Sequence, residues 1–180
     1  ALFEKPTSRS AELASLATAS YPTAIDVSAD GRTAVVSHEG STKKISVIDL
    51  VTRSLTASFG TPESLYWQVI RITPDKSHAI AAVLNNVIFV DLATGQTTAN
   101  LLTTSVGDIE ISFDGRYAFS SGYYGKVIEL ASQTIVASLP LGARGEAAVS
   151  PVDYRAVALN NSLREDVHFF WIDGAASVAE

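Results

Sequence analysis

The chain has 180 residues, of which 47% are hydrophobic and 18% are charged, a composition typical of a folded globular domain with one sizeable core. Nineteen acidic and 13 basic residues give a formal net charge of −6, which argues against a phosphate-binding surface and so against a nucleic-acid partner. No apolar run approaches the roughly 18 to 20 residues that a membrane-spanning helix needs.

Cysteine and methionine are both missing from the sequence. The first absence excludes disulfides, thiolate catalysis and cysteine-ligated zinc. Without an initiator methionine, the polypeptide that starts at Ala1 is expected to be a processed product or a piece of a longer protein.

Residues 1–11 contain Pro6 and mixed charge without an apolar period, and we predict an irregular arm. The next segment, 12–20, contains the triplet Ala14-Ser15-Leu16, which is similar to three later triplets in the chain. We therefore predict that 12–20 is a further copy of the last strand of a repeated unit, placed ahead of the first complete unit.

One landmark of the repeat is an acidic residue that follows a branched apolar one, with an alanine eight positions later. It occurs at Asp49, Asp91 and Glu129, and a related Ile-Asp pair lies near the end of the chain. A second landmark is a turn rich in Asp, Gly and Pro between two apolar runs, which is hairpin chemistry. The turn copies are 28–34, 73–79, 112–118 and, more loosely, 150–156.

Each unit contains short segments rich in Val, Ile, Thr and aromatic residues with visible alternation, which predicts four β-strands in each of the first three units and three in the last. Four-stranded units that repeat every 38 to 45 residues or so are typical of β-propeller blades. A β-sandwich with chance similarity between strands is the alternative, but two landmarks that recur in the same order argue against it. The predicted blades are 21–60, 61–104, 105–142 and 143–180 within a propeller domain that spans 12–180.

Two of the units, VSADGRTAVVSH with KISVIDLVTRSLTASF and ISFDGRYAFSSG with KVIELASQTIVASL, resemble the YVTN-type β-propeller repeat over about residues 12–173. The resemblance implies an all-β propeller of four-stranded antiparallel blades, and it marks a fold rather than a chemistry. The fourth unit departs most, because Val152 stands where the turn acid is expected and no final strand is evident.

The missing strand suggests how the chain ends could meet. If the ring closes within one chain, 12–20 would complete the fourth blade. Proteins similar to this family usually carry about seven blades, so the alternatives are two copies in a larger ring or a part of a longer propeller. We favour an incomplete or assembled larger ring, which implies a homo-oligomer or a partner chain.

Alignment of the innermost strands places Asp26, Arg71, Glu110 and Ala148 at equivalent positions. In a propeller these side chains would lie near the central channel. An acid, a base and an acid on successive blades can pair as structural ion pairs, or they can line a polar channel that binds an ion or a small ligand.

His38, His78 and His168 fall at different positions of the repeat, so the repeat offers no convergence of metal ligands, and we predict no metal site. The Asp26 to Gly31 segment is similar to the start of an EF-hand loop, but the twelfth position is Ser37 and not glutamate, which predicts a simple turn. No nucleophile elbow, phosphate loop or dinucleotide fingerprint is present, and we predict no cofactor and no catalytic residue.

Loops at one end of the blades would offer residue types that anchor interfaces. We predict a non-catalytic scaffold or binding module that recognises a protein or a polysaccharide there. Two of these residues, Tyr66 and Trp67, have the alternative of packing between blades. The candidate binding residues are Tyr66, Trp67, Tyr123, Tyr124, Arg144 and Arg164.

The resemblance also implies a second hypothesis, since propellers similar to this one occur in lactonases and in quinone- or haem-dependent oxidoreductases. Its chemistry would rest on a channel ligand or on a cofactor held elsewhere. This hypothesis comes from fold analogy alone. The same resemblance, with the missing initiator, implies an extracytoplasmic location, either periplasmic or secreted.

Overall fold

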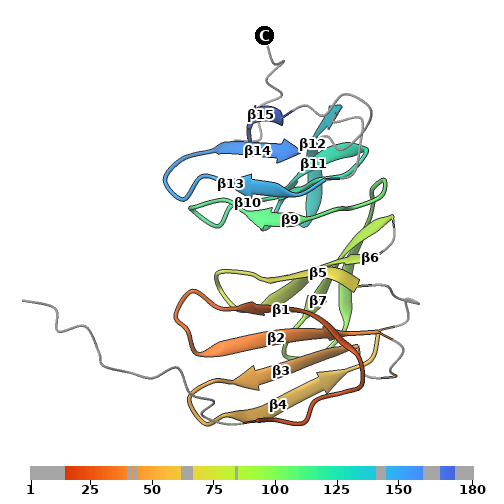
Figure 1. Ribbon diagram of the computed structural model, residues 1–180, viewed down its shortest axis with the longest axis vertical. Helices are drawn as coiled ribbons and strands as arrows, with labels where there is room; N and C mark the ends of the chain where they lie inside the picture. Colours follow the sequence, from red (N-terminus) through yellow and green to blue (C-terminus); the bar gives the residue numbers. More distant parts are fainter. Residues whose placement is uncertain are drawn as a thin grey trace, which may run out of the picture.

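The computed structural model describes residues 15–39, 42, 44–61, 67–83, 85–140, 145–159 and 167–172, except the side chains of 67, 68 and 140. Every regular element among them is a β-strand (Figure 1). The strands form four antiparallel sheets, each with its strands in sequence order. This confirms the predicted all-β, propeller-type fold with four blades.

The first three blades have four strands each. Blade 1 consists of β1 (Pro22–Val27), β2 (Thr33–His38), β3 (Ile45–Asp49) and β4 (Ser54–Phe59). Blade 2 consists of β5 (Trp67–Ile72), β6 (His78–Val83), β7 (Asn86–Asp91) and β8 (Thr97–Leu102). Blade 3 consists of β9 (Ile109–Ile111), β10 (Tyr117–Ser120), β11 (Tyr124–Glu129) and β12 (Thr134–Pro140).

Blade 4 has three strands among the described residues, β13 (Ala147–Val149), β14 (Arg155–Leu159) and β15 (Val167–Trp171). The strand predicted to complete it, at 12–20, is described from residue 15 onwards. Residues 15–20 form no strand and lead directly into blade 1 (Figure 1). The described part of this segment, 15–20, therefore adds no strand to blade 4, and residues 12–14 lie outside the described residues.

The turn between the first two strands of a blade is stabilised by an aspartate whose carboxylate accepts hydrogen bonds within the turn. In blade 1 the Asp30 carboxylate accepts hydrogen bonds from the Ser28 hydroxyl at 2.6 Å and the Arg32 amide at 3.1 Å. Asp75 and Asp114 make the corresponding bonds in blades 2 and 3. In blade 4 the carboxylate comes one position later, at Asp153, and still accepts from the amide two residues on. The turn landmark is therefore a set of self-capping aspartates.

The other landmark caps the turn between the third and fourth strands. Asp49 accepts hydrogen bonds from the amides of Val51 and Thr52, and Asp91 repeats this geometry in blade 2. A residue with positive φ follows four positions after each acid of the landmark, at 53, 95 and 133. Repetition of local hydrogen bonds thus explains why the acids recur in the sequence.

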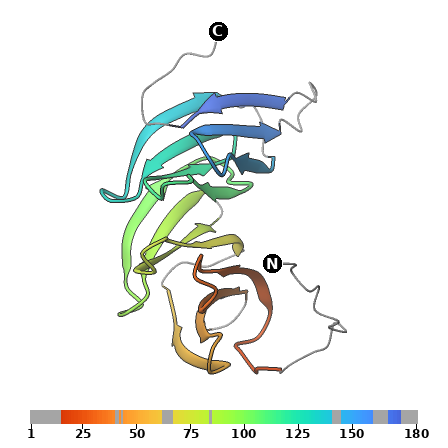
Figure 2. The same ribbon diagram turned by 90° about the vertical axis from the view of Figure 1, so that its left-hand side faces the viewer.

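Three apolar cores lie between successive blades, because each sheet packs against the sheet that follows it along the chain. Val35 and Ile88 belong to the first core, Phe89 and Ile128 to the second. The third core contains Phe119, which packs with Ala156 and Phe170 of blade 4. Figure 2 shows the resulting open arc, in which blades 1 and 4 lie at opposite ends.

The innermost strands β1, β5, β9 and β13 follow one another along the inner side of this arc. Their register confirms the sequence alignment of the repeat, because Val27, Ile72, Ile111 and Val149 each pair with an alanine of the second strand. Asp26, Arg71 and Glu110 therefore occupy one equivalent position on three successive blades.

Candidate functional site

A polar network crosses the junctions between the innermost strands, and its centre is Arg71 on β5. One terminal nitrogen of Arg71 lies 2.5 Å from Glu110 Oε1 and 3.3 Å from Asp108 Oδ1, both on the next blade. The other terminal nitrogen donates to the carbonyl of Ile70 at 3.1 Å. All three charged side chains are mostly buried, so water screens these ion pairs only in part.

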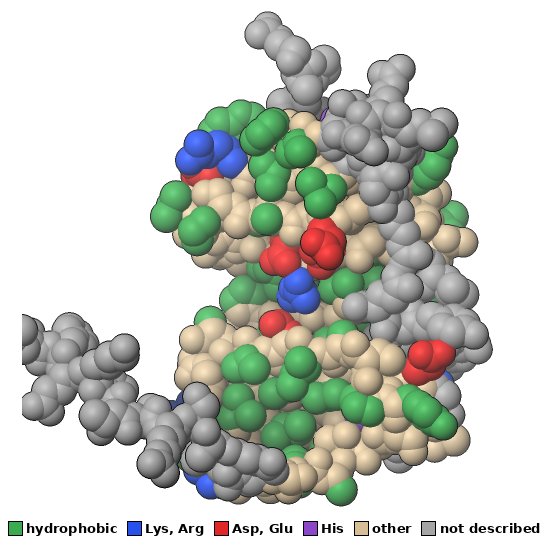
Figure 3. Space-filling view, in the orientation of Figure 1, with side chains coloured by type: hydrophobic (Ala, Val, Ile, Leu, Met, Phe, Trp, Pro, Cys, Tyr) green, Lys and Arg blue, Asp and Glu red, His purple; other side chains and the backbone are tan. Residues whose placement is uncertain are grey.

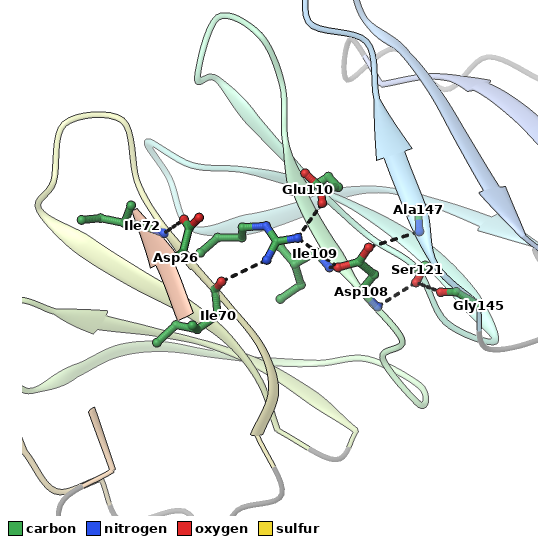
Figure 4. A network of polar contacts seen from close by, with 10 residues as sticks. Asp26, Ile70, Ile72, Asp108, Ile109, Glu110, Ser121, Gly145 and Ala147 are labelled. Atoms are coloured by element: carbon green, nitrogen blue, oxygen red, sulfur yellow. Dashed lines mark hydrogen bonds and ion pairs between the residues drawn. The ribbon is translucent and has the colours of Figure 1, made fainter. Parts of the chain in front are cut away.

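The network continues to both sides of Arg71 (Figure 4). Asp26 on β1 accepts a hydrogen bond from the backbone amide of Ile72 at 2.8 Å. On the far side, the second oxygen of Asp108 accepts from the amide of Ala147 at 3.3 Å. Each of the three blade junctions is thus crossed by a polar contact between innermost strands. In Figure 3 these acidic and basic groups gather in the hollow at the middle of the molecule.

The charge balance around Arg71 sets its protonation. Burial lowers the pKa of the guanidinium, but the hydrogen bond with Glu110 and the negative charges of Glu110, Asp108 and Asp26 outweigh burial and raise the pKa above its usual value. Arg71 is therefore positively charged at neutral pH, and it serves as a counter-ion for the carboxylates around it.

The structure brings two of the predicted channel residues, Arg71 and Glu110, into direct contact. Asp26 does not bond the Arg71 side chain and holds the neighbouring backbone instead. Sequence analysis missed Asp108, although it lies two positions before Glu110 and thus on the same face of the predicted strand. The two-residue spacing from Glu110 was the feature of the sequence that could have identified Asp108.

A second cluster lies at the end of the blades where the second and third strands connect, and we call it the loop-end patch. Tyr123 and Tyr124 are exposed, with ring centroids 6.0 Å apart in an edge-on arrangement. Lys126 places its ammonium 5.6 Å from the centroid of the Tyr124 ring and donates to the hydroxyl of Ser138 at 2.9 Å.

The loop-end patch is fixed to blade 2 by the connection between the two blades. The amides of Tyr123 and Tyr124 donate to the carbonyl and the hydroxyl of Thr104, at 3.1 and 3.3 Å. The amide of Ser105 donates to the side-chain oxygen of Asn85 at 3.2 Å. The residues of the loop-end patch are Asn85, Thr104, Ser105, Tyr123, Tyr124 and Lys126.

The other predicted interface residues are not placed. Tyr66, Arg144 and Arg164 lie outside the described residues, and so does the side chain of Trp67, whose backbone begins β5. Their role in binding, and the alternative that Tyr66 and Trp67 pack between blades, both remain predictions.

The histidines have separate surroundings. His38 is buried and lies 2.9 Å from the Ser46 hydroxyl; burial lowers its pKa against the opposing effect of the Ala19 and Ser20 carbonyls. His78 contacts Ser77 and Gln133, and His168 stacks on Phe170. Within the described ranges no group of three or more His, Asp or Glu side chains could hold a metal ion.

Fold and network together define a β-propeller-type protein whose blades are joined by polar contacts along the innermost strands. No protein-family model matches the sequence, and no curated protein matches it. Among solved structures, the chain is similar to hydrazine synthase of Kuenenia stuttgartiensis, with a TM-score of 0.73 and 21% sequence identity.

That match covers 91% of this chain and 50% of the hydrazine synthase chain, so the protein spans about half the length of its structural neighbour. At this identity the likeness shows the fold alone, and the YVTN-type family stays a resemblance. None of the described residues belongs to a helix long and apolar enough to cross a bilayer.

Proposed function

We propose that the protein is a non-catalytic β-propeller module that binds its partner through the loop end of its blades. The observation that carries this proposal is the loop-end patch, where two adjacent tyrosine rings are exposed on a backbone held by Thr104. Tyrosine offers a large apolar surface with a polar tip and loses little entropy on binding. The hydrogen bonds to blade 2 preorganise the rings, which lowers the cost of binding.

Of the two partner classes, a protein or a polysaccharide, the loop-end patch favours a polysaccharide. Around the rings lie hydroxyl and amide side chains, from Thr104, Ser105 and Asn85, and Lys126 is the one charged residue of the patch. Hydroxyls and amides both donate and accept hydrogen bonds, which suits a ligand that is itself rich in hydroxyl groups. Among the described residues of the patch, a protein partner of strong charge would find only the ammonium of Lys126 as a charged group.

The test is affinity electrophoresis of the full chain in gels that contain a panel of neutral and acidic polysaccharides. The double variant Tyr123→Ala/Tyr124→Ala should lose retardation in the gels that retard the wild type, with at least a tenfold weaker dissociation constant. The matched control is Phe113→Ala, because Phe113 is as exposed as Tyr124 but lies in a turn at the opposite end of blade 3. Equal retardation of the wild type and the double variant would overturn the proposal.

A second candidate function is suggested by the name of the structural neighbour, an enzyme. In this alternative the chain is the propeller portion of a lactonase-like enzyme or of a quinone- or haem-dependent oxidoreductase whose cofactor is held elsewhere. It rests on fold likeness alone. A stoichiometric metal ion or a visible chromophore in the purified protein would favour it over the binding module.

We also propose a periplasmic or secreted location, which rests only on the YVTN resemblance. Cell fractionation of the source organism with an antibody against the chain tests it. Recovery with the cytoplasmic fraction would contradict it.

A further inference from the structure

Blade 3 carries a charged side chain at a position that is uncharged in blades 1 and 2. The register of the strands places Ser46, Ile88 and Lys126 at one equivalent position of the third strand. Ser46 and Ile88 are both 0% exposed, whereas Lys126 is half-buried and belongs to the loop-end patch. In blade 4 the position holds His168, whose ring stacks on Phe170. The repeat therefore does not need an ammonium group here, and Lys126 is particular to blade 3.

The residue opposite Lys126 is polar as well. Ser120 pairs with Lys126 across the strands, and it occupies the position of Ala81 in blade 2. Residues that face each other in an antiparallel pair lie on the same side of the sheet. Ser120 is 1% exposed, and its hydroxyl has no hydrogen-bond partner among the described residues. Burial of such a hydroxyl costs free energy, so packing alone does not account for the two polar side chains.

The ammonium of Lys126 has neutral partners in the described part of the chain. It donates to the hydroxyl of Ser138 at 2.9 Å and lies 5.6 Å from the centroid of the Tyr124 ring. No described carboxylate lies within 4.0 Å of it, whereas the ammonium of Lys76 pairs with Asp30 at 2.7 Å. An ammonium group has three donors, so Lys126 can keep its bond to Ser138 and still donate to a ligand.

We propose that Lys126 recognises an anionic group, a carboxylate or a sulfate, of an acidic polysaccharide whose sugar rings contact Tyr123 and Tyr124. This inference rests on the proposed function and narrows the partner to acidic polysaccharides. Hydrogen bonds from an ammonium to an anionic oxygen are roughly twice as strong as those between neutral groups. An anionic group would supply the counter-ion that the described residues do not, whereas a neutral polysaccharide offers the ammonium only hydroxyls.

The charge of the chain limits how densely the polysaccharide can be charged. The formal net charge is −6, and Lys126 is the one positive residue of the loop-end patch. A polymer with a charge on every sugar would be repelled by the acidic chain and would meet a single ammonium. Neutral sugars between the charged ones would instead place uncharged rings against the tyrosines. We therefore expect isolated anionic groups separated by neutral sugars.

The experiment is affinity electrophoresis of the full chain in gels that contain one polysaccharide each. Hyaluronan and gellan have carboxylates separated by neutral sugars, keratan sulfate has sulfates without carboxylates, and polygalacturonate is charged on every sugar. Carboxyl-reduced hyaluronan and gellan are the matched neutral ligands. Hyaluronan or gellan should retard the chain if the group is a carboxylate, and keratan sulfate if it is a sulfate. Polygalacturonate and the reduced polymers should retard it less.

Three variants test the role of Lys126. In the gel that retards the wild type, Lys126→Gln should bind at least about tenfold more weakly, because a charge-assisted hydrogen bond is lost. Lys126→Arg keeps the positive charge and should retain most of the binding. The control is Lys76→Gln, which removes the same charge at the opposite end of the blades. Added salt should weaken binding of the wild type more than binding of Lys126→Gln. Circular dichroism checks that every variant is folded.

The outcomes separate this inference from the proposed function. Equal retardation by the acidic and the reduced polymers, lost in Tyr123→Ala/Tyr124→Ala but kept in Lys126→Gln, would overturn the recognition of an anionic group and leave the binding module intact. Equal losses in Lys126→Gln and Lys76→Gln would also overturn it, because net charge alone would then explain the binding. Retardation that the double tyrosine variant leaves unchanged, or no retardation in any gel, would overturn both proposals.

Discussion

Arg71 illustrates how a single residue joins two blades. Its guanidinium bonds two carboxylates of blade 3 and a carbonyl of its own strand, so its loss leaves Asp108 and Glu110 close together without a counter-ion. The unpaired partners, more than the lost contact itself, determine the cost. The network therefore has a structural role, because it joins the innermost strands of two blades.

We expect Arg71→Gln to lower the free energy of unfolding by about 1–3 kcal/mol. The measurement is urea unfolding at neutral pH, followed by tryptophan fluorescence. Arg155→Gln is the control, because the ion pair of Arg155 with Asp153 is exposed and should contribute less than about 1 kcal/mol. Equal losses for the two variants would mean that the ion pairs of Arg71 contribute no more to stability than the exposed ion pair of Arg155.

Among the structural elements, the turns between the first two strands show that neighbouring strands can impose a backbone conformation that the residue in the turn does not favour. Gly31 and Gly115 have φ values of 67° and 71°, which other residues adopt only with strain. Lys76 occupies the equivalent place in blade 2 with a φ of 61°. The turn geometry is thus imposed on a residue that does not favour it, because the strands on both sides fix it.

The two glycines allow strain and packing to be separated. At Gly31 an added Cβ meets nothing within 4 Å, whereas at Gly115 it would lie 2.7 Å from a ring carbon of Pro74 on the neighbouring blade. Gly31→Ala should cost about 1 kcal/mol from the backbone alone. Gly115→Ala should cost at least about 1 kcal/mol more, since Pro74 must move. Urea unfolding of both variants measures the difference in the free energy of unfolding. Equal losses would show that Pro74 of blade 2 moves aside without cost in stability.

For the whole molecule, the aspartates that cap the turns make stability depend on pH. Hydrogen bonds from neighbouring side chains and amides hold the pKa of Asp75 below its ordinary value, the Thr73 hydroxyl contributing most. The carboxyl pKa is also lowered at other turns along the arc, namely at Asp30, Asp49, Asp91, Asp114 and Asp153. The stabilisation is therefore distributed over all four blades.

The direction of this pH dependence follows from the linkage between proton binding and folding. A carboxyl whose pKa is lower in the folded state binds fewer protons there than in the unfolded chain, so it contributes stability above the unfolded pKa of about 3.9. That contribution is lost as the pH falls through this value towards the folded pKa. We expect the free energy of unfolding to decrease steadily from about pH 5 downwards, and Asp75→Asn to reduce the decrease. Urea unfolding at pH 7, 5 and 3 measures how the free energy of unfolding changes with pH. The same change in the Asp75→Asn variant as in the wild type would contradict the contribution assigned to Asp75.

The sequence alone determined the blade as a unit, since the acids and glycines of the turns act through hydrogen bonds that span two or three residues. It also determined the equivalence of Asp26, Arg71 and Glu110, because strand register follows from those turns. The partners of these side chains were decided only in the tertiary structure: Asp26 holds a backbone amide, while Arg71 bonds Asp108 as well as Glu110.

Whether residues 15–20 form a strand was likewise decided by tertiary structure. A triplet such as Ala14-Ser15-Leu16 can suit the last strand of any blade, because such a strand needs only alternation and an edge to pair with. Which edge it meets depends on how far the blades fan around their axis. That angle is the sum of packing at every junction, and no short stretch of sequence encodes it.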